Sequence, residues 1–423
     1  MIKQATVALE TLGCKLNQAE TETLARQFVG AGFRLVDSSQ PADVWVLNTC
    51  TVTHIADRKS RHLLRLARRQ NPKALLVATG CYVERSPDDL ARMGEVDLLA
   101  DNRNKSHLVE MVSHMLGTSC SVESSGLSGP GCDGFKTRAM IKIQDGCNDF
   151  CSYCIVPYVR GREHSLSPDE ILSEIQARLN AGYKEIVITG TKLGAYQADG
   201  TGLQQLLGRV LAETKVTRLR LSSVQPADLT PDFLSLWNDV RMCPQIHMPL
   251  QSGSSSVLQR MKRHYSPDDF EQAVRLARQL IPDLAVTTDV IVGIPGESTE
   301  EFEESYRFCE KMAFAAIHVF PYSKRPGTLA ADMPEAISAQ VKRGRSERLL
   351  KLSRHAVEQF RRRFLGRTME VLWESKQDDI WQGLTGNYIR VKAHSGSDLV
   401  NCLEPVRLTG LCQGGMRGEL TKS

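Results

Sequence analysis

Apolar runs and amphipathic stretches alternate along residues 1–116. The strand-like runs are Thr6–Leu12, Val44–Leu47, Leu75–Ala78 and Val96–Ala100, and the stretches with helical periodicity are Glu20–Val29, Ala56–Arg69 and Ser106–Leu116. Strands that alternate with helices are typical of a parallel sheet with helices on its faces. We therefore expect residues 1–116 to form an N-terminal open parallel α/β domain.

This periodicity is lost in residues 117–134, where Ser and Gly dominate. Such a composition predicts a linker. Cys120 and Cys132 fall within it, where a preorganised metal site is not expected.

Six further apolar runs, separated by helical stretches, occupy residues 135–365. The strand candidates are Ala139–Ile143, Glu185–Thr189, Arg218–Leu221, Gln245–Met248, Val286–Val292 and Ala316–Phe320. The clearest helices are Ser167–Ala181, Asp268–Leu280, Thr299–Lys311 and a basic helix at Ser338–Phe364. Six successive βα units predict a partial, TIM-like (β/α)6 barrel that is open along one side.

After Gly366 the segments become short and alternating, at Met369–Trp373, Tyr388–Lys392 and Val406–Leu408, among Gly, Asn and Asp. These are strand signals, and they predict a small all-β domain at residues 366–423.

The composition, 41% hydrophobic and 24% charged residues, is that of an ordinary globular protein. No apolar run reaches the length of a membrane span and the first residues lack a signal-peptide pattern, so we expect a cytoplasmic protein with no membrane partner. Twelve cysteines are many for that compartment, where disulfides are rare. We expect the isolated Cys243, Cys309, Cys402 and Cys412 to be small buried apolar residues.

The net charge of +4 is unevenly distributed. Residues 58–69 carry six basic residues and no acid, and residues 342–367 carry ten basic residues opposed only by Glu347 and Glu358. A basic run is most often a solvated helix face, but two such runs also fit a polyanionic partner such as RNA. The candidate RNA contacts in the second run are Arg361, Arg362 and Arg363.

The strongest chemical signal is the group Cys147, Cys151 and Cys154, directly after the first strand of the predicted barrel. Three thiolates at this spacing can hold three corners of a [4Fe–4S] cluster on one loop, which leaves the fourth iron open to a small chelating molecule. A structural zinc site would need a fourth ligand, and only His164 is near in sequence. The spacing therefore favours the cluster.

Three more cysteines, Cys14, Cys50 and Cys81, each follow a predicted strand of the N-terminal sheet. The carboxyl ends of strands in an open parallel sheet form its ligand crevice. We therefore expect these three thiols to converge on one point. Three unrelated buried cysteines would show no such common position.

The group around Cys147 resembles the motif of the radical S-adenosylmethionine superfamily, whose members carry an aromatic residue at the position of Tyr153. The resemblance implies that S-adenosylmethionine chelates the open iron and is cleaved to methionine and a 5′-deoxyadenosyl radical. It also assigns Thr189, Gly190 and Thr191 to the methionine amino group, and a turn with Gly293, Pro295 and Gly296 to the adenine.

Together with the three N-terminal cysteines, this motif resembles the methylthiotransferase family over almost the whole chain. Segments that fit are Gln144–Cys147, Tyr153–Pro157, Arg160–Gly161, His247–Gly253 and Tyr322–Ala330. The resemblance implies that Cys14, Cys50 and Cys81 bind an auxiliary [4Fe–4S] cluster. It also implies that S-adenosylmethionine is used twice, once to donate a methyl group to sulfur and once to form the radical.

The tail around Gly386–Val391 is similar to the TRAM domain of that family, a small OB-like RNA-binding β-barrel, in which Asn387 and Tyr388 are candidate RNA contacts. Because acidic and basic residues are balanced in this tail, we expect the electrostatic contribution to RNA binding to come more from the basic helix.

The loop Leu12–Thr21 most resembles the branch that acts on N6-threonylcarbamoyladenosine at position 37 of tRNA. Lys15 in this loop could face the threonyl carboxylate or could be a solvated lysine. The base would be extruded from the anticodon loop, because its C2 is inaccessible inside a stack. We expect a monomer that also needs an electron donor such as flavodoxin or ferredoxin, and a sulfur source.

Three alternatives stay open. The substrate could be isopentenyladenosine in tRNA or an aspartate of a ribosomal protein. Outside this class of enzyme, the chain could be a zinc-dependent RNA-binding protein.

Overall fold

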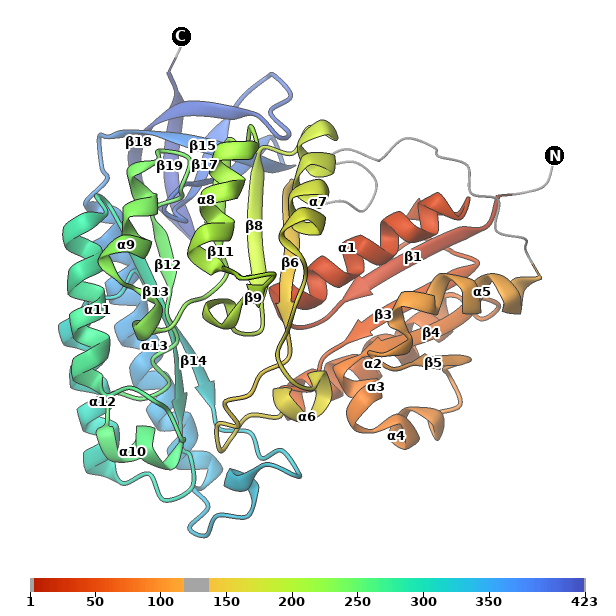
Figure 1. Cartoon of the computed structure of the whole chain (residues 1–423), viewed down its shortest axis with the longest axis horizontal. Coiled ribbons are helices and arrows are strands. Elements are labelled where there is room, and N and C mark those ends of the chain that lie inside the picture. The colour runs from red at the N-terminus through yellow and green to blue at the C-terminus, as the bar shows by residue number, and fades with distance from the viewer. Residues whose placement is uncertain (1–3, 118–136, 422–423) are drawn as a thin grey trace.

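The computed structural model describes residues 4–117 and 137–421, which form three successive parts (Figure 1). Cys120, Cys132 and nearly all of the predicted linker lie outside the described residues.

The N-terminal part is a parallel five-stranded sheet in the order β2-β1-β3-β4-β5. Its strands are β1 Thr6–Thr11, β2 Arg34–Val36, β3 Val44–Thr49, β4 Leu75–Gly80 and β5 Leu98–Ala100. Its helices are α1 Lys15–Gly30, α2 His54–Gln70, α3 Cys81–Arg85, α4 Pro87–Ala91 and α5 Leu108–Leu116. This arrangement is consistent with the predicted parallel sheet. The short edge strand β2 was not predicted.

The central strand β3 shows why this sheet needs helices on both faces. Val44 and Val46 pack into the core beneath α1 and α5. Trp45 and Leu47 pack into a second core with α2, α3 and α4. Successive side chains of a strand point to opposite faces, so an unbroken apolar run requires cover on each side.

The middle part is a partial barrel of six parallel strands. They are β6 Arg138–Asp145, β8 Glu185–Gly190, β11 Arg218–Leu221, β12 Gln245–His247, β13 Ala285–Val292 and β14 Ala316–Pro321. A single bridge between Leu219 and Met242 joins the first three strands to the last three. A two-residue strand, β7 His164–Ser165, lies antiparallel to β6. The predicted barrel architecture, with its six strands, is confirmed.

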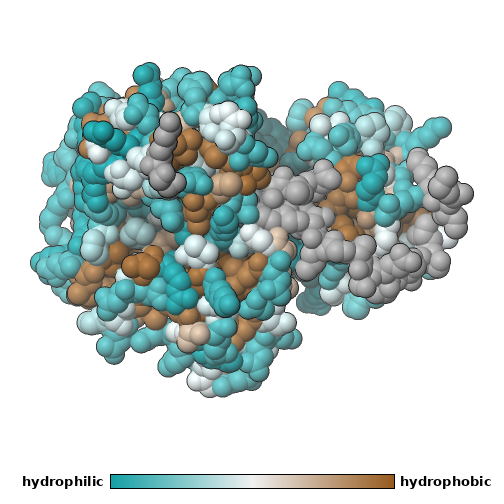
Figure 2. Space-filling view, turned by 90° about the horizontal axis from the view of Figure 1, so that it is seen from above, coloured by the Kyte–Doolittle hydropathy of each residue, from teal (hydrophilic) through white to brown (hydrophobic). Residues whose placement is uncertain are grey.

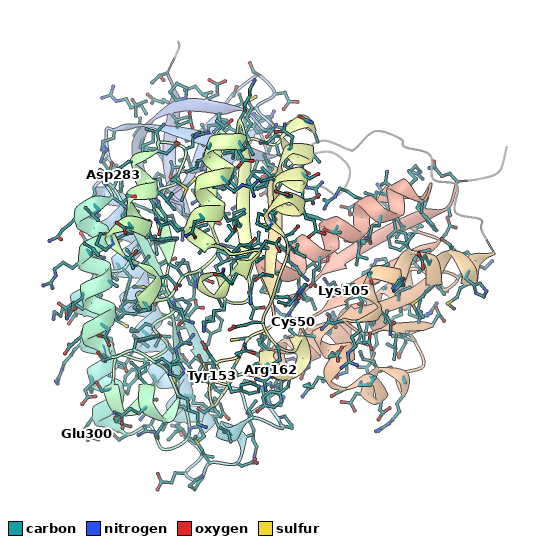
Figure 3. The ribbon with its side chains drawn as sticks, in the orientation of Figure 1. Cys50, Lys105, Tyr153, Arg162, Asp283 and Glu300 are labelled. Atoms are coloured by element: carbon teal, nitrogen blue, oxygen red, sulfur yellow. The ribbon has the colours of Figure 1, made fainter. Side chains whose placement is uncertain are left out.

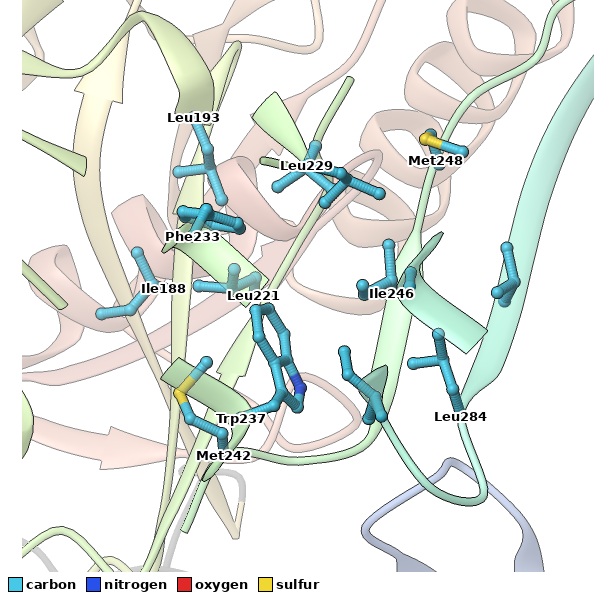
Figure 4. Close-up of a cluster of buried hydrophobic side chains, with 14 of the residues drawn as sticks. Ile188, Leu193, Leu221, Leu229, Phe233, Trp237, Met242, Ile246, Met248 and Leu284 are labelled. Carbon is cyan, nitrogen blue, oxygen red and sulfur yellow. The ribbon is translucent and has the colours of Figure 1, made fainter. Parts of the chain in front are cut away.

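Helices cover the outside of this barrel. They are α7 Pro168–Asn180, α8 Leu203–Glu213, α9 Pro231–Leu234, α10 Ser255–Arg260, α11 Pro267–Leu280 and α12 Thr299–Met312, and a small hairpin, β9 Gln197–Ala198 with β10 Thr201–Gly202, precedes α8. The short helix α6 Val156–Arg160 instead packs against α3 of the N-terminal part. Capping boxes that begin with Ser167, Ser266 and Ser298 fix the starts of α7, α11 and α12. Strand and helix residues then share one large core, which includes Ile188, Leu221 and Trp237 (Figure 4).

The long basic helix α13 Ala339–Arg362 runs beside β14, the last barrel strand (Figure 1). The Ser353 hydroxyl accepts a hydrogen bond from the Ile317 N–H at 3.0 Å and donates one to the Ile317 carbonyl at 2.9 Å. The helix therefore satisfies backbone groups on the edge of β14.

The C-terminal part is a closed five-stranded barrel in the order β15-β16-β17-β19-β18. Its strands are β15 Thr368–Gln377, β16 Ile380–Thr385, β17 Arg390–His394, β18 Leu403–Cys412 and β19 Gly415–Leu420. The all-β prediction is confirmed, but β16 and β19 were not predicted. Cys243 and Cys309 are buried as expected, whereas Cys402 and Cys412 are only partly buried, because they lie beside or at an end of β18.

Seen from above, the molecule has a large lobe, which contains the two barrels, and a smaller N-terminal lobe (Figure 2). Helix α1 packs against β6 at the junction between them, where Ala19 contacts Met140 and Val187. Among the described residues, no helix is both long enough and apolar enough to cross a bilayer.

Candidate functional site

Cys147, Cys151 and Cys154 lie on one tight loop after β6. Its shape is set by Gly146, which has φ +71°, and a Cβ at this position would lie 1.9 Å from the Arg162 carbonyl oxygen. The Cys147 N–H donates to the Gly161 carbonyl at 3.1 Å, and the Cys154 N–H donates to the Cys151 carbonyl at 2.9 Å. The loop thus holds three thiols close together at the end of a barrel strand.

Cys14, Cys50 and Cys81 come from three separate strand ends of the N-terminal sheet, and the structure brings them to one cavity. Cys14 caps α1, Cys50 follows β3 and Cys81 begins α3. A Cβ on Gly13, which has φ +106°, would lie 2.9 Å from Cys50 Sγ. The glycine therefore lets the loop of Cys14 pass directly over Cys50.

Burial raises the pKa of Cys50 and that of Cys154, each to about 12. The other two thiols of each group raise these values further, since neighbouring thiolates repel one another. Thiols of this kind stay protonated at neutral pH unless a positively charged metal centre binds the thiolate. Without a bound metal centre, Cys50 and Cys154 are therefore poor nucleophiles.

The spacing of the sulfur atoms distinguishes a cluster from a zinc ion. Tetrahedral zinc with Zn–S bonds of about 2.3 Å needs ligand sulfurs roughly 3.8 Å apart. Among the described residues, neither set of three cysteines has all three sulfur atoms within 4.8 Å of one another. His164, the candidate fourth ligand, is exposed on β7. The wider spacing fits a four-iron cube better than one zinc ion.

A network of buried charges joins the two cysteine groups across the domain junction. Arg160 Nη1 lies 2.9 Å from Glu20 Oε1 of α1 and 3.0 Å from Asp145 Oδ2 of β6. Lys105 and Lys142 also pair with Glu20, at 2.6 and 3.1 Å. Figure 3 shows Lys105 and Cys50 on the side of the N-terminal part that faces the barrel.

The residues assigned to S-adenosylmethionine lie on two sides of the cluster loop. Thr189, Gly190 and Thr191 line the same cavity as the N-terminal cysteines. The turn that contains Gly293, Pro295 and Gly296 follows β13 on the other side, and its Ile294 shares a small apolar cluster with Tyr153. Glu297 Oε2 accepts a hydrogen bond from the Gly293 N–H at 2.6 Å, and Arg345 of α13 pairs with the same carboxylate.

One cavity of about 650 Å³ connects the N-terminal cysteines with the inside of the barrel and with the C-terminal barrel. Its lining includes Lys15 and Asn17 of α1, polar side chains of β12, β13 and β14, and Arg361, Asn387 and Tyr388. The polar wall is formed by His247, Asp289 and His318, whose ligand atoms lie within 4.8 Å of one another. Sequence reasoning missed this wall, because each residue alone is an ordinary strand residue.

The candidate RNA contacts occupy different places. Arg361 borders the cavity, Arg362 pairs with Glu358, and the guanidinium of Arg363 lies over the rings of Phe360 and Phe364, at the end of α13 and just beyond it. Asn387 is buried and hydrogen-bonds the Asp283 carbonyl, and Tyr388 faces the cavity. These last two could contact only a nucleotide that enters the cavity.

Comparison with protein families gives two matches. Residues 141–309 match the model described as the radical SAM superfamily. Residues 6–101 match the model described as uncharacterized protein family UPF0004. The two matches fall on the barrel and on the N-terminal sheet.

Full-length relatives are similar throughout. The threonylcarbamoyladenosine tRNA methylthiotransferase MtaB of Bacillus subtilis is 36% identical, over 96% of this chain and 94% of the relative. The MtaB of Chlamydia pneumoniae is 37% identical, over 99% and 98%. The tRNA-2-methylthio-N(6)-dimethylallyladenosine synthase of Acetivibrio thermocellus is 32% identical, over 99% and 92%.

Among solved structures, the radical S-adenosylmethionine methyltransferase TsrM from Kitasatospora setae aligns with a TM-score of 0.58 at 15% identity, over 78% of this chain and 77% of that chain. The cobalamin-dependent S-adenosylmethionine radical enzyme OxsB aligns with a TM-score of 0.51 at 13% identity, over 78% and 55%. At such identity these likenesses show the fold alone.

Proposed function

This chain belongs to the methylthiotransferase family of radical S-adenosylmethionine enzymes, and we propose that it converts N6-threonylcarbamoyladenosine at position 37 of tRNA to its 2-methylthio derivative. The observation that carries the proposal is the meeting of Cys14, Cys50 and Cys81 with Thr189–Thr191 in one cavity. The choice of substrate is supported by greater identity to relatives named for threonylcarbamoyladenosine, at 36–37%, than to one named for dimethylallyladenosine, at 32%.

The family uses S-adenosylmethionine and two [4Fe–4S] clusters. We assign Cys147, Cys151 and Cys154 to the cluster that binds S-adenosylmethionine, and Cys14, Cys50 and Cys81 to the auxiliary cluster. When bound, these cofactors supply the electron, the hydrogen-abstracting radical and the methylthio group that replaces hydrogen on adenine C2.

The protein's own residues position these groups. Tyr153 and the turn with Gly293, Pro295 and Gly296 form the adenine side of the S-adenosylmethionine site, and Glu297 fixes that turn through the Gly293 N–H. Thr189, Gly190 and Thr191 form its methionine side.

Recognition of tRNA would combine two surfaces. Helix α13 supplies basic residues for phosphates, with Arg361 at the mouth of the cavity. The C-terminal barrel, which we assign as a TRAM domain, brings Tyr388 to the cavity, where an extruded base could contact its ring. We keep residues 1–116, 135–365 and 366–423 as the proposed domains.

The remaining requirements are an electron donor such as flavodoxin or ferredoxin, a sulfur source and a cytoplasmic location, since the substrate is tRNA. We propose that the chain acts as a monomer.

The decisive experiment is nucleoside mass spectrometry of tRNA from a strain that lacks the gene. We expect the 2-methylthio form of threonylcarbamoyladenosine to disappear and the unmethylthiolated nucleoside to accumulate. Loss of 2-methylthio-isopentenyladenosine instead would assign the other tRNA substrate, and loss of a ribosomal-protein modification would assign the protein substrate.

Anaerobic reconstitution tests the cofactors separately. About eight irons per chain are expected for two four-iron clusters. Zinc in place of iron, with no 5′-deoxyadenosine formed under reduction, would support the alternative of a zinc-dependent RNA-binding protein.

A further inference from the structure

Three cationic side chains lie within 6 Å of the ring centroid of Tyr388, which lines the cavity. The guanidinium of Arg220 lies 4.1 Å from the ring centroid, and that of Arg138 lies 5.6 Å from it. The ammonium of Lys15 also lies 5.6 Å from the centroid. Residues from α1, β6, β11 and the C-terminal barrel therefore meet at one position.

Two of these cations already have carboxylate partners. Arg220 Nε lies 2.7 Å from Glu185 Oε1, and Arg138 Nε lies 2.6 Å from Glu374 Oε1. Lys15 differs, because it forms no ion pair with a carboxylate of residues 4–117 or 137–421. Its side chain instead hydrogen-bonds that of Tyr388.

A partly buried cation without a carboxylate partner is costly, and a bound anion would reduce that cost. The N-terminus of α1, a helix of 16 residues, adds positive potential at the same place, and its first turn contains no acidic residue. Lys15 lines the cavity, so an anionic ligand can reach it there.

The position of Lys15 relative to Cys14 suggests which anion this is. In adenine, C2 and the carbon that bears N6 flank the same ring nitrogen. If C2 faces the auxiliary cluster, a substituent on N6 therefore extends along the neighbouring wall. Lys15 directly follows Cys14 in the chain, begins α1 and lines the same cavity as Cys14.

The rest of the wall suits the other groups of a threonylcarbamoyl chain. His318 lines the same cavity as Lys15. Burial lowers the pKa of His318, and the nearby charges of His247 and Lys15 lower it further. Asp289 Oδ2 lies 3.3 Å from His247 Nε2, and both line the cavity. These side chains offer acceptors for the ureido N–H groups and donors or acceptors for the threonyl hydroxyl.

We propose that Lys15 binds the carboxylate of the threonyl group and so selects threonylcarbamoyladenosine over adenosines with an uncharged N6 substituent. This inference rests on the proposed function and names the residue that recognises its substrate. Lys15 is a binding residue, and it acts by pairing with a charge that isopentenyladenosine lacks.

The test compares wild-type holoenzyme with Lys15→Met and Lys15→Arg on two tRNA substrates. One carries threonylcarbamoyladenosine, and the other carries the same nucleoside with its carboxylate converted to the methyl ester. For wild type we expect kcat/KM to fall about 10- to 100-fold on esterification, as is typical of a lost charge-assisted hydrogen bond. Lys15→Met should lose a similar factor on the acid substrate and should no longer distinguish the acid from the ester.

Lys15→Arg keeps the charge and should retain part of the preference for the acid. The iron content of each variant, measured in parallel, reports whether Cys14 still binds its cluster, and a variant with full iron content is informative even if its melting temperature is lower. Undiminished discrimination between acid and ester by Lys15→Met would overturn the inference. Failure of the wild-type enzyme to modify the acid substrate would instead count against the proposed function.

Discussion

Arg160 of the barrel donates a hydrogen bond of 2.6 Å to the side-chain oxygen of Asn17 in α1. The Asn17 amide in turn donates to the carbonyl oxygens of Leu12 and Thr49, at 2.7 and 3.0 Å, beside Cys14 and Cys50. This relay fixes the two cysteine loops of the N-terminal sheet relative to the barrel.

The first prediction concerns Glu20, whose carboxylate pairs with Arg160, Lys105 and Lys142. Glu20→Gln leaves the largely buried side chains of Arg160 and Lys105, and the partly exposed Lys142, with one fewer counter-charge, and we expect a loss of about 3 kcal/mol in stability. Thermal unfolding at pH 7 measures it. The exposed pair of Arg209 with Glu213 provides the control, because Glu213→Gln should leave the melting temperature unchanged.

The same variant has a defined pH dependence. Burial raises the pKa of the Glu20 carboxyl, but the three cations outweigh burial and hold that pKa well below 4.5. A carboxylate with a lowered folded-state pKa contributes its full stabilisation above the unfolded value, and the contribution is lost as the pH falls toward the folded value. The difference in melting temperature between wild type and Glu20→Gln should therefore shrink below about pH 4.5. A constant difference down to pH 3 would contradict this account of Glu20.

The two cysteine groups should bind iron independently. Replacing Cys14, Cys50 or Cys81 by Ala should lower reconstituted iron from about eight to about four per chain and leave reductive formation of 5′-deoxyadenosine detectable. Replacing Cys147, Cys151 or Cys154 should also leave about four irons but abolish 5′-deoxyadenosine. Cys402→Ala is the control and should retain full iron. Unchanged iron content in the first group would remove the auxiliary cluster.

Gly293 should be required for binding S-adenosylmethionine. Its φ is +75°, and an added Cβ would lie 2.2 Å from Lys342 Cγ of α13. Gly293→Ala combines backbone strain of about 1 kcal/mol or more with a displacement of α13, and we expect a higher KM for S-adenosylmethionine. Gly344 lies on α13, and a Cβ added there would have nothing within 4 Å. Gly344→Ala should therefore leave the KM for S-adenosylmethionine unchanged. Formation of 5′-deoxyadenosine at varied S-adenosylmethionine measures both.

Arg361 should contribute to the electrostatic part of tRNA binding. It borders the cavity and belongs to the basic helix, so we expect Arg361→Ala to weaken binding and to reduce the slope of log K against log salt by about one. Arg348 of the same helix pairs with Glu303 on its exposed surface, and Arg348→Ala should change the slope little. Binding isotherms at several salt concentrations separate the two; equal slopes for wild type and Arg361→Ala would exclude a phosphate contact at Arg361.

Several features of the fold were predictable because their signals are local. The β3 run Val44–Leu47 and the capping serines of α7, α11 and α12 each specify structure within a few residues. β2 is only three residues long, and β16 and β19 contain glycine, which is depleted in strands, so local propensity did not reveal these three strands. The two-residue strands β7, β9 and β10 were not predicted either.

The candidate site divides in the same way. The amino-acid sequence by itself determined the loop of Cys147, Cys151 and Cys154, since three thiols within eight residues must lie close together. Tertiary structure alone decided that Glu20 and Asn17 meet Arg160, and that Lys15 meets Tyr388 from the far end of the chain. The physical reason is that Coulombic and hydrogen-bond contacts depend on distance in space, and charged side chains carry no periodic signal that identifies their partners. That Lys15 has no carboxylate partner among the described residues could therefore be seen only in the folded protein.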